Sequence, residues 1–186
     1  MRKSFLAVVM LFLAVKFAFA GWEMPFGLRL GVDTPEAVKK VVMENGGVIK
    51  EEGNKIIKQD IVNPDIYGIK VKNLNVDYLN YAIFWFYKGR LYQIEYVFPL
   101  NMEHEEFYLI EKKLRAKYGS PSRYVKPYLA DGVAVWRNGD IEIKLLAPWT
   151  SWSMYLTYTH KPLESQALNS DNYYLNKTLS KPSKGL

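Results

Sequence analysis

Cysteine is absent from the 186-residue chain, and histidine occurs only twice. The lack of cysteine excludes disulfide bonds, thiol nucleophiles, thiolate metal ligands and a lipid-modified N-terminal cysteine. His104 and His160 are far apart in the sequence and belong to no ligand set with the spacing of a zinc site. No serine lies in a Gly-x-Ser-x-Gly nucleophile elbow. The sequence therefore predicts no catalytic residue, no metal ligand and no cofactor.

An excess of positive charge is also lacking from the body of the chain. The formal net charge is +6, but most of it lies before residue 21 and after residue 160, which leaves about +1 for residues 21–160. A nucleic-acid-binding protein needs clustered positive charge to displace counterions from phosphates. The charge distribution therefore excludes nucleic acid as a partner.

The N-terminus has the three parts of a secretory signal. Arg2 and Lys3 precede an apolar run over residues 4–15, and Ala18 and Ala20 supply the small residues of a cleavage site. The run is too short for a membrane span of roughly 20 residues. We expect residues 1–20 to be removed, which predicts a periplasmic or secreted protein without an integral membrane span. The charge of Lys16, directly after the apolar run, leaves a retained N-terminal anchor as the alternative.

Two helices are predicted from their end signals. Residues 34–36 (Thr-Pro-Glu) have the cap, first-turn proline and acidic residue of a helix start, and residues 45–47 (Asn-Gly-Gly) are typical of a helix end. A second helix is expected over about 102–118, with Asn101 as its cap, glutamates in its first turn and basic residues in its last.

Alternating apolar residues predict antiparallel strands. In the segment 91–98, Tyr92, Ile94, Tyr96 and Phe98 are expected to share one face. The expected strands are 55–62, 67–71, 82–87, 91–98, 132–137, 140–146 and 151–160. We therefore predict a single α+β domain over residues 21–162, in which two helices pack on one face of a largely antiparallel sheet of six or seven strands.

The order of helix, strands, helix and strands further indicates two helix-plus-hairpin repeats. After Pro162 the composition shifts to serine, asparagine and lysine. Such a composition buries little apolar surface, so residues 163–186 are predicted to form a flexible tail.

The start of the domain resembles a known group of exported proteins. Residues 26–31 (FGLRLG), followed by 34–38 (TPEAV), resemble the opening of small exported α/β repeats such as the SmpA-type outer-membrane assembly lipoproteins and the β-lactamase-inhibitor-protein fold. The lipidated cysteine of the first and the disulfides of the second are missing here. The resemblance implies a non-enzymatic protein-binding module and carries over no site residue.

Aromatic residues make up 15% of the chain, and two of the five tryptophans stand out. Trp149 and Trp152 lie in the segment 147–152 (APWTSW), where an exposed ring could grip a partner or stack on a sugar. Burial in the core is the alternative, and we expect it more for Trp152, which continues the alternation of the last strand.

Carboxylates and histidine offer weaker candidates. Glu95 and Glu142 occupy equivalent strands of the two halves and could form the acid pair of a hydrolase, or simply face solvent beside lysines. His104 lies among glutamates, which we interpret as an acidic helix start rather than a metal site. The sequence thus predicts an exported envelope module that binds a protein partner without being an enzyme. An envelope hydrolase and a carbohydrate-binding module are the alternatives.

Overall fold

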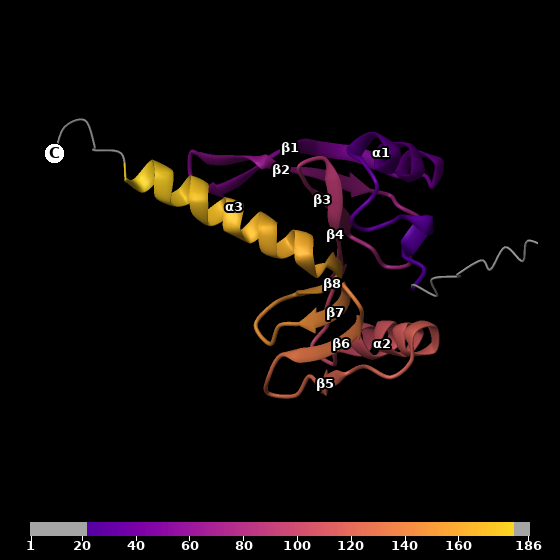
Figure 1. The fold of residues 1–186 in the computed structure, drawn as a ribbon. Helices are drawn as coiled ribbons and strands as arrows, with labels where there is room; N and C mark the ends of the chain where they lie inside the picture. Colours follow the sequence, from indigo (N-terminus) through magenta and orange to yellow (C-terminus); the bar gives the residue numbers. More distant parts are fainter. Residues whose placement is uncertain (1–21, 181–186) are drawn as a thin grey trace, which may run out of the picture.

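The computed structural model describes residues 22–180, and Figure 1 shows their fold. These residues form one eight-stranded sheet and three α-helices, which confirms the α+β class. The predicted leader, with Ala18 and Ala20, lies outside the described residues. The elements are η1 (Pro25–Gly27), α1 (Pro35–Glu44), β1 (Val48–Lys58), β2 (Ile61–Lys72), β3 (Tyr81–Tyr87), β4 (Arg90–Pro99), α2 (Glu105–Tyr118), β5 (Arg123–Val125), β6 (Gly132–Asn138), β7 (Ile141–Ala147), β8 (Ser153–His160) and α3 (Lys161–Leu179).

The strands are arranged as two similar units. The sheet order is β1-β2-β3-β4-β8-β7-β6-β5, and every neighbouring pair is antiparallel. The helix α1 precedes the first four strands and α2 precedes the last four, so that β4 and β8 meet in the middle of the sheet. The repeat is therefore a helix followed by a four-stranded meander rather than by a single hairpin.

The first hairpin is longer than predicted. Residues 63–65, expected to separate two strands, lie inside β2, and the turn falls at Gln59, whose φ is 45°. The pairing shifts register between Asn54 and Lys55, opposite this segment, and this irregularity accommodates Pro64, which has no N–H to donate to the ladder.

The two predicted helices, α1 and α2, pack on the same face of the sheet (Figure 1). Thr34 caps α1, because its Oγ accepts a hydrogen bond from the Ala37 N–H at 3.4 Å. The apolar stripes of the two helices and the inward residues of β2, β3, β4, β6, β7 and β8 form one continuous core. Its fully buried members include Val38, Phe84, Ile94, Phe107, Trp136, Ile143 and Met154.

A third helix, α3, occupies most of the predicted flexible tail, so that prediction was wrong for residues 163–179. The His160 ring caps the helix, because its Nδ1 accepts from the Leu163 N–H at 3.3 Å. The buried positions of α3 are Leu163, Ala167, Ser170 and Asp171. They recur at helical spacing and form one face, which the polar overall composition obscures.

The helix α3 packs on the opposite face of the sheet from α1 and α2. Leu163 and Ala167 bury a small cluster there with Ile66, Tyr87 and Tyr92. Tyr92 was expected on the same face as Ile94. It is the extra residue of a bulge, since Trp85 pairs with Gln93 and Phe86 pairs with Leu91, and the bulge turns it toward α3.

Candidate functional site

Two loops meet at one end of the central strands β4 and β8 and form a pocket there. Because Pro99 at the end of β4 pairs with Ser153 at the start of β8, the β4–α2 connection lies beside the β7–β8 loop. The pocket has a volume of about 250 Å³. Its lining residues are Asn101, Met102 and His104 from the first loop and Trp149, Thr150, Ser151 and Trp152 from the second. We call this the tryptophan pocket.

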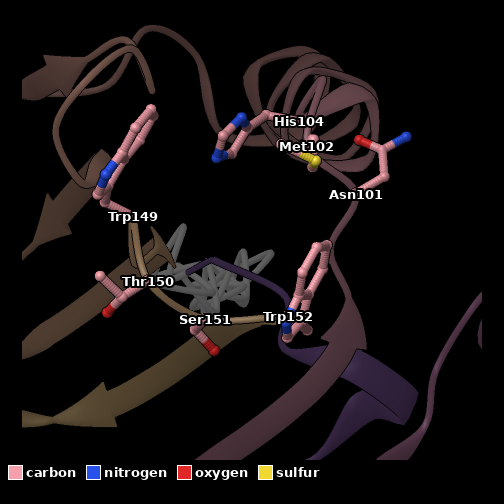
Figure 2. A pocket seen from close by; sticks show the side chains of 7 residues that line it. All are labelled: Asn101, Met102, His104, Trp149, Thr150, Ser151 and Trp152. Atoms are coloured by element: carbon pink, nitrogen blue, oxygen red, sulfur yellow. The ribbon is translucent and has the colours of Figure 1, made fainter.

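The two indoles stand at different ends of this pocket. Figure 2 shows Trp149 facing His104 and Trp152 below Asn101, with Thr150 and Ser151 between the two indoles along the loop. Trp149 is 47% exposed and Trp152 is 72% exposed. The sequence-predicted pair is therefore brought into one site.

The expectation that Trp152 is the more buried of the two was wrong. The strand β8 begins only at Ser153, and Met154 is the first residue of the alternation to enter the core. Before it, the Ser153 N–H donates to the Ser151 Oγ at 3.0 Å, which shapes a turn and ends the alternation. The Trp152 backbone stays attached, since its carbonyl accepts from the Leu100 N–H at 3.0 Å, while its side chain points outward.

The wall of the pocket formed by Trp149 is held in place by a hydrogen bond and by stacking. The backbone N–H of Trp149 donates to the Asp131 Oδ1 at 2.8 Å. The Trp149 ring lies nearly parallel to the His104 ring, with an interplanar angle of 12° and centroids 6.2 Å apart. The pocket walls are thus preformed, which lowers the entropic cost of binding.

His104 is a structural part of this site. It is only 7% exposed and has a left-handed backbone with a φ of 57°. Such a φ is uncommon outside glycine, and it ends the preceding turn, so that α2 begins at Glu105 rather than near 102. Asn101 still acts at the helix start, because its Oδ1 accepts from the Glu105 N–H at 3.1 Å. Among residues 22–180, no group of three histidine or acidic side chains could hold a metal ion.

Three exposed apolar residues in or near the pocket had not been singled out from the sequence. The β5–β6 loop (126–131) lies at the same end of the strands, since Gly132 pairs with Ala147, and it carries Tyr128 and Leu129. Met102, which lines the pocket, is 77% exposed and had also been missed. A single apolar residue in a loop is ordinary, so the sequence gives no signal for these residues until the strand pairing shows which loops lie together.

The two acids of the hydrolase alternative lie on the same face of the sheet, on the strands β4 and β7. Glu95 and Glu142 lie on either side of β8, opposite Thr157 and Thr159 respectively. Two strand spacings and two residues along the strand separate their Cα atoms by about 12 Å. The Glu142 carboxylate accepts from the Arg137 Nε at 2.8 Å and is ion-paired with Lys161.

Glu95 lies in a different environment. Burial raises the pKa of Glu95 above its usual value, and a hydrogen bond with Trp85 acts in the opposite direction. The two carboxylates therefore have different partners.

Comparison with known proteins gives one family. Residues 25–170 match the model of the TP0088 domain, a span that includes both units of the sheet, the tryptophan pocket and the first half of α3. No curated protein and no solved structure matches the chain. None of the helices among the described residues has the length and apolar character needed to cross a membrane.

Proposed function

The chain belongs to the TP0088 domain family, and for this member we propose an exported, non-enzymatic module of the cell envelope that binds a protein partner through the tryptophan pocket. The export part of the proposal is supported by residues 1–20, whose charge, apolar run and Ala18–Ala20 pattern are those of a secretory signal. The protein would then act in the periplasm or outside the cell.

The observation that carries the binding proposal is the exposure of both indoles. Leaving a large apolar side chain in water forgoes roughly 1.5–3 kcal/mol of burial, so folding gives little reason for it. Five exposed apolar residues lie on three loops at the same end of neighbouring strands: Met102, Tyr128, Leu129, Trp149 and Trp152. Tryptophan, tyrosine and methionine are the residues enriched at protein–protein interfaces, and clustered exposed apolar residues mark such sites.

The chemistry of the pocket supports an apolar occupant. Its lining includes no acidic, lysine or arginine side chain. Binding an apolar side chain of a partner there would cost little desolvation, and the volume of about 250 Å³ has room for one. We infer that the partner inserts an aromatic or aliphatic side chain between the two tryptophans.

Carbohydrate binding is the second candidate for the same pocket. Asn101, Thr150 and Ser151 place an amide and two hydroxyl groups beside the indoles. Such a combination of an aromatic platform and neutral hydrogen-bonding groups also suits a sugar ring.

The test is a pull-down from native envelope with the mature protein and the variant Trp152→Ala. We expect one or more proteins to bind the wild type and to be lost from the variant, because truncating a central interface tryptophan typically costs about 2 kcal/mol or more, roughly a thirtyfold loss of affinity. Tyr173→Ala is the matched control, since Tyr173 is an exposed aromatic residue on α3, away from the pocket. An unchanged set of captured proteins in Trp152→Ala would overturn the proposal. Capture of polysaccharide in place of protein, lost in the same variant, would favour the second candidate.

A further inference from the structure

A second hollow lies on the face of the sheet opposite α1 and α2, over β1, β2 and β3. It is an open groove with a volume of about 570 Å³. Gly53 pairs with Gly68, and Gly68 pairs with Trp85, so these three residues form one row across the three strands. The two glycines leave the floor of the groove without side chains over two neighbouring strands. We call this the glycine groove.

The Trp85 ring lies over Gly68. A Cβ atom at Gly68 would come within 2.6 Å of the Trp85 Cζ3 and 2.9 Å of its Cε3. Only glycine permits this approach, because real Cβ contacts are never so short. The indole also packs against the cluster under α3. The ring is therefore held by packing against Gly68 and the cluster, and it lines the groove as an aromatic platform.

A second aromatic ring lines the groove farther along β3. Tyr81 is on the same face as Trp85, with Ile83 between them, and lies about 13 Å away along the strand. The Lys70 ammonium group lies 5.0 Å from the centroid of the Tyr81 ring. The groove thus has two rings spaced along one line, joined by an apolar residue.

The charges at the rim are balanced by partners within the chain. Lys70 is ion-paired with Glu51 at 3.3 Å, and Lys55 with Asp171 at 2.6 Å. The lining of the groove includes two lysine and two glutamate side chains, so neither sign of charge is in excess. A charged ligand therefore gains little there, whereas a neutral ligand rich in hydroxyl groups can use both kinds of hydrogen-bonding partner.

We propose that the glycine groove binds a neutral oligosaccharide, with one sugar ring on Trp85 and another beside Tyr81. The apolar C–H face of a sugar suits the flat indole, and the hydroxyl groups at its edge suit the Lys70–Glu51 pair. An added peptide strand is disfavoured, because β1, the strand at this edge, carries three register shifts and charged side chains that hinder further pairing. The proposal concerns a different site from the tryptophan pocket and does not depend on it.

Gly53 offers a way to block the groove without disturbing the fold. Its φ is not positive, and a Cβ built there meets nothing within 4 Å. Gly53→Tyr should therefore fold and place a side chain in the groove, while Gly53→Ala should leave most of the space open. Trp85→Ala would remove the platform, but it also opens the cluster under α3 and is used only as a supporting variant.

The experiment screens the mature protein against an array of neutral gluco-, chito-, manno- and xylo-hexasaccharides and measures the hits by calorimetry. We expect at least one hexasaccharide to bind the wild type and Gly53→Ala, and to bind Gly53→Tyr at least tenfold more weakly. Trp152→Ala should bind like the wild type, which separates this site from the tryptophan pocket. The absence of binding to every hexasaccharide, equal binding by Gly53→Tyr, or loss of binding only in Trp152→Ala would each overturn the proposal.

Discussion

The two faces of the sheet differ in how they are covered. One face carries α1 and α2 over a continuous apolar core, in which residues such as Phe84, Ile94 and Trp136 are fully buried. The other face is covered in part by α3, over a five-residue apolar cluster. The first face thus has the interior of an ordinary domain, with one largely apolar hollow of about 310 Å³ between Phe98, Leu114 and Leu156, whereas the second leaves open grooves between polar and aromatic side chains.

Polar contacts replace apolar ones where α3 meets the first hairpin. The Asp171 carboxylate accepts from the Lys55 Nζ at 2.6 Å and from the Asn63 Nδ2 at 2.8 Å. Beside it, the Ser170 Oγ donates to the Asp65 Oδ2 at 2.9 Å. Such a network gives a helix a defined position, but each member depends on its partners, since unpaired buried polar groups are costly. We therefore expect the free energy of unfolding to depend on buried apolar volume on the face under α1 and α2. On the face under α3 we expect it to depend on hydrogen bonds.

The largest expected effect is on the apolar face, for Trp136→Ala. Trp136 is fully buried, and its Nε1 donates to the Gly119 carbonyl at 2.7 Å. Truncation leaves a cavity and should lower the free energy of unfolding by about 3–5 kcal/mol in urea titrations. Trp152→Ala is the matched control and should change it by less than about 0.5 kcal/mol. Equal losses in the two variants would show that the exposed indole is part of the core, which would remove the contrast on which the binding proposal rests.

A smaller loss is expected for Asp171→Ala on the opposite face. The change leaves the Asn63 amide buried and without its acceptor, and should cost about 1–3 kcal/mol in the same titrations. Lys113→Ala is the control, because its ion pair with Asp77 is exposed at both ends and such pairs contribute about 0–1 kcal/mol. If Asp171→Ala were no worse than Lys113→Ala, α3 would not be held by the polar network.

The same contrast explains how much of the fold could be predicted from the sequence. The stripe of Val38 and Val42 in α1 and the alternation from Ile94 to Phe98 in β4 are patterns that one apolar core imposes, and the alternation was predicted correctly. The helix α3 was missed because two of its four buried positions are Ser170 and Asp171. A helix that docks through hydrogen bonds has no apolar stripe to find.

The candidate site was predicted in part for a similar reason. Trp149 and Trp152 were selected by residue type, and the structure brings them together. Met102 and His104 could not be added, because their place in the pocket depends on the pairing of Pro99 with Ser153 in the middle of the sheet. The bulge that turns Tyr92 to the other face is likewise set by its neighbouring strand, so the period of two within β4 does not reveal it.

The smallest expected effect concerns Glu95, which lies on the open face beside Trp85. Burial raises the pKa of this carboxyl in the folded state, whereas in the unfolded chain it keeps its ordinary value near pH 4. Below that pH the Glu95 carboxyl is protonated in both the folded and the unfolded protein, so no charge is buried on folding. As the pH rises, the unfolded state loses its proton first, so the stability falls until the folded carboxyl is also ionised, and the cost then remains.

Glu95→Gln should remove this dependence, because its amide keeps a similar shape and has no charge to bury. We expect thermal melts at about pH 4 and about pH 7 to show a larger gain for the variant over the wild type at the higher pH. Glu103→Gln, at an exposed position before α2, controls for the loss of one negative charge from the protein. A gain that is the same at both pH values would mean that Glu95 is solvated in the folded protein. The face that carries α3 would then be more solvated around Glu95 than the structure indicates, and so would differ more from the closely packed face under α1 and α2.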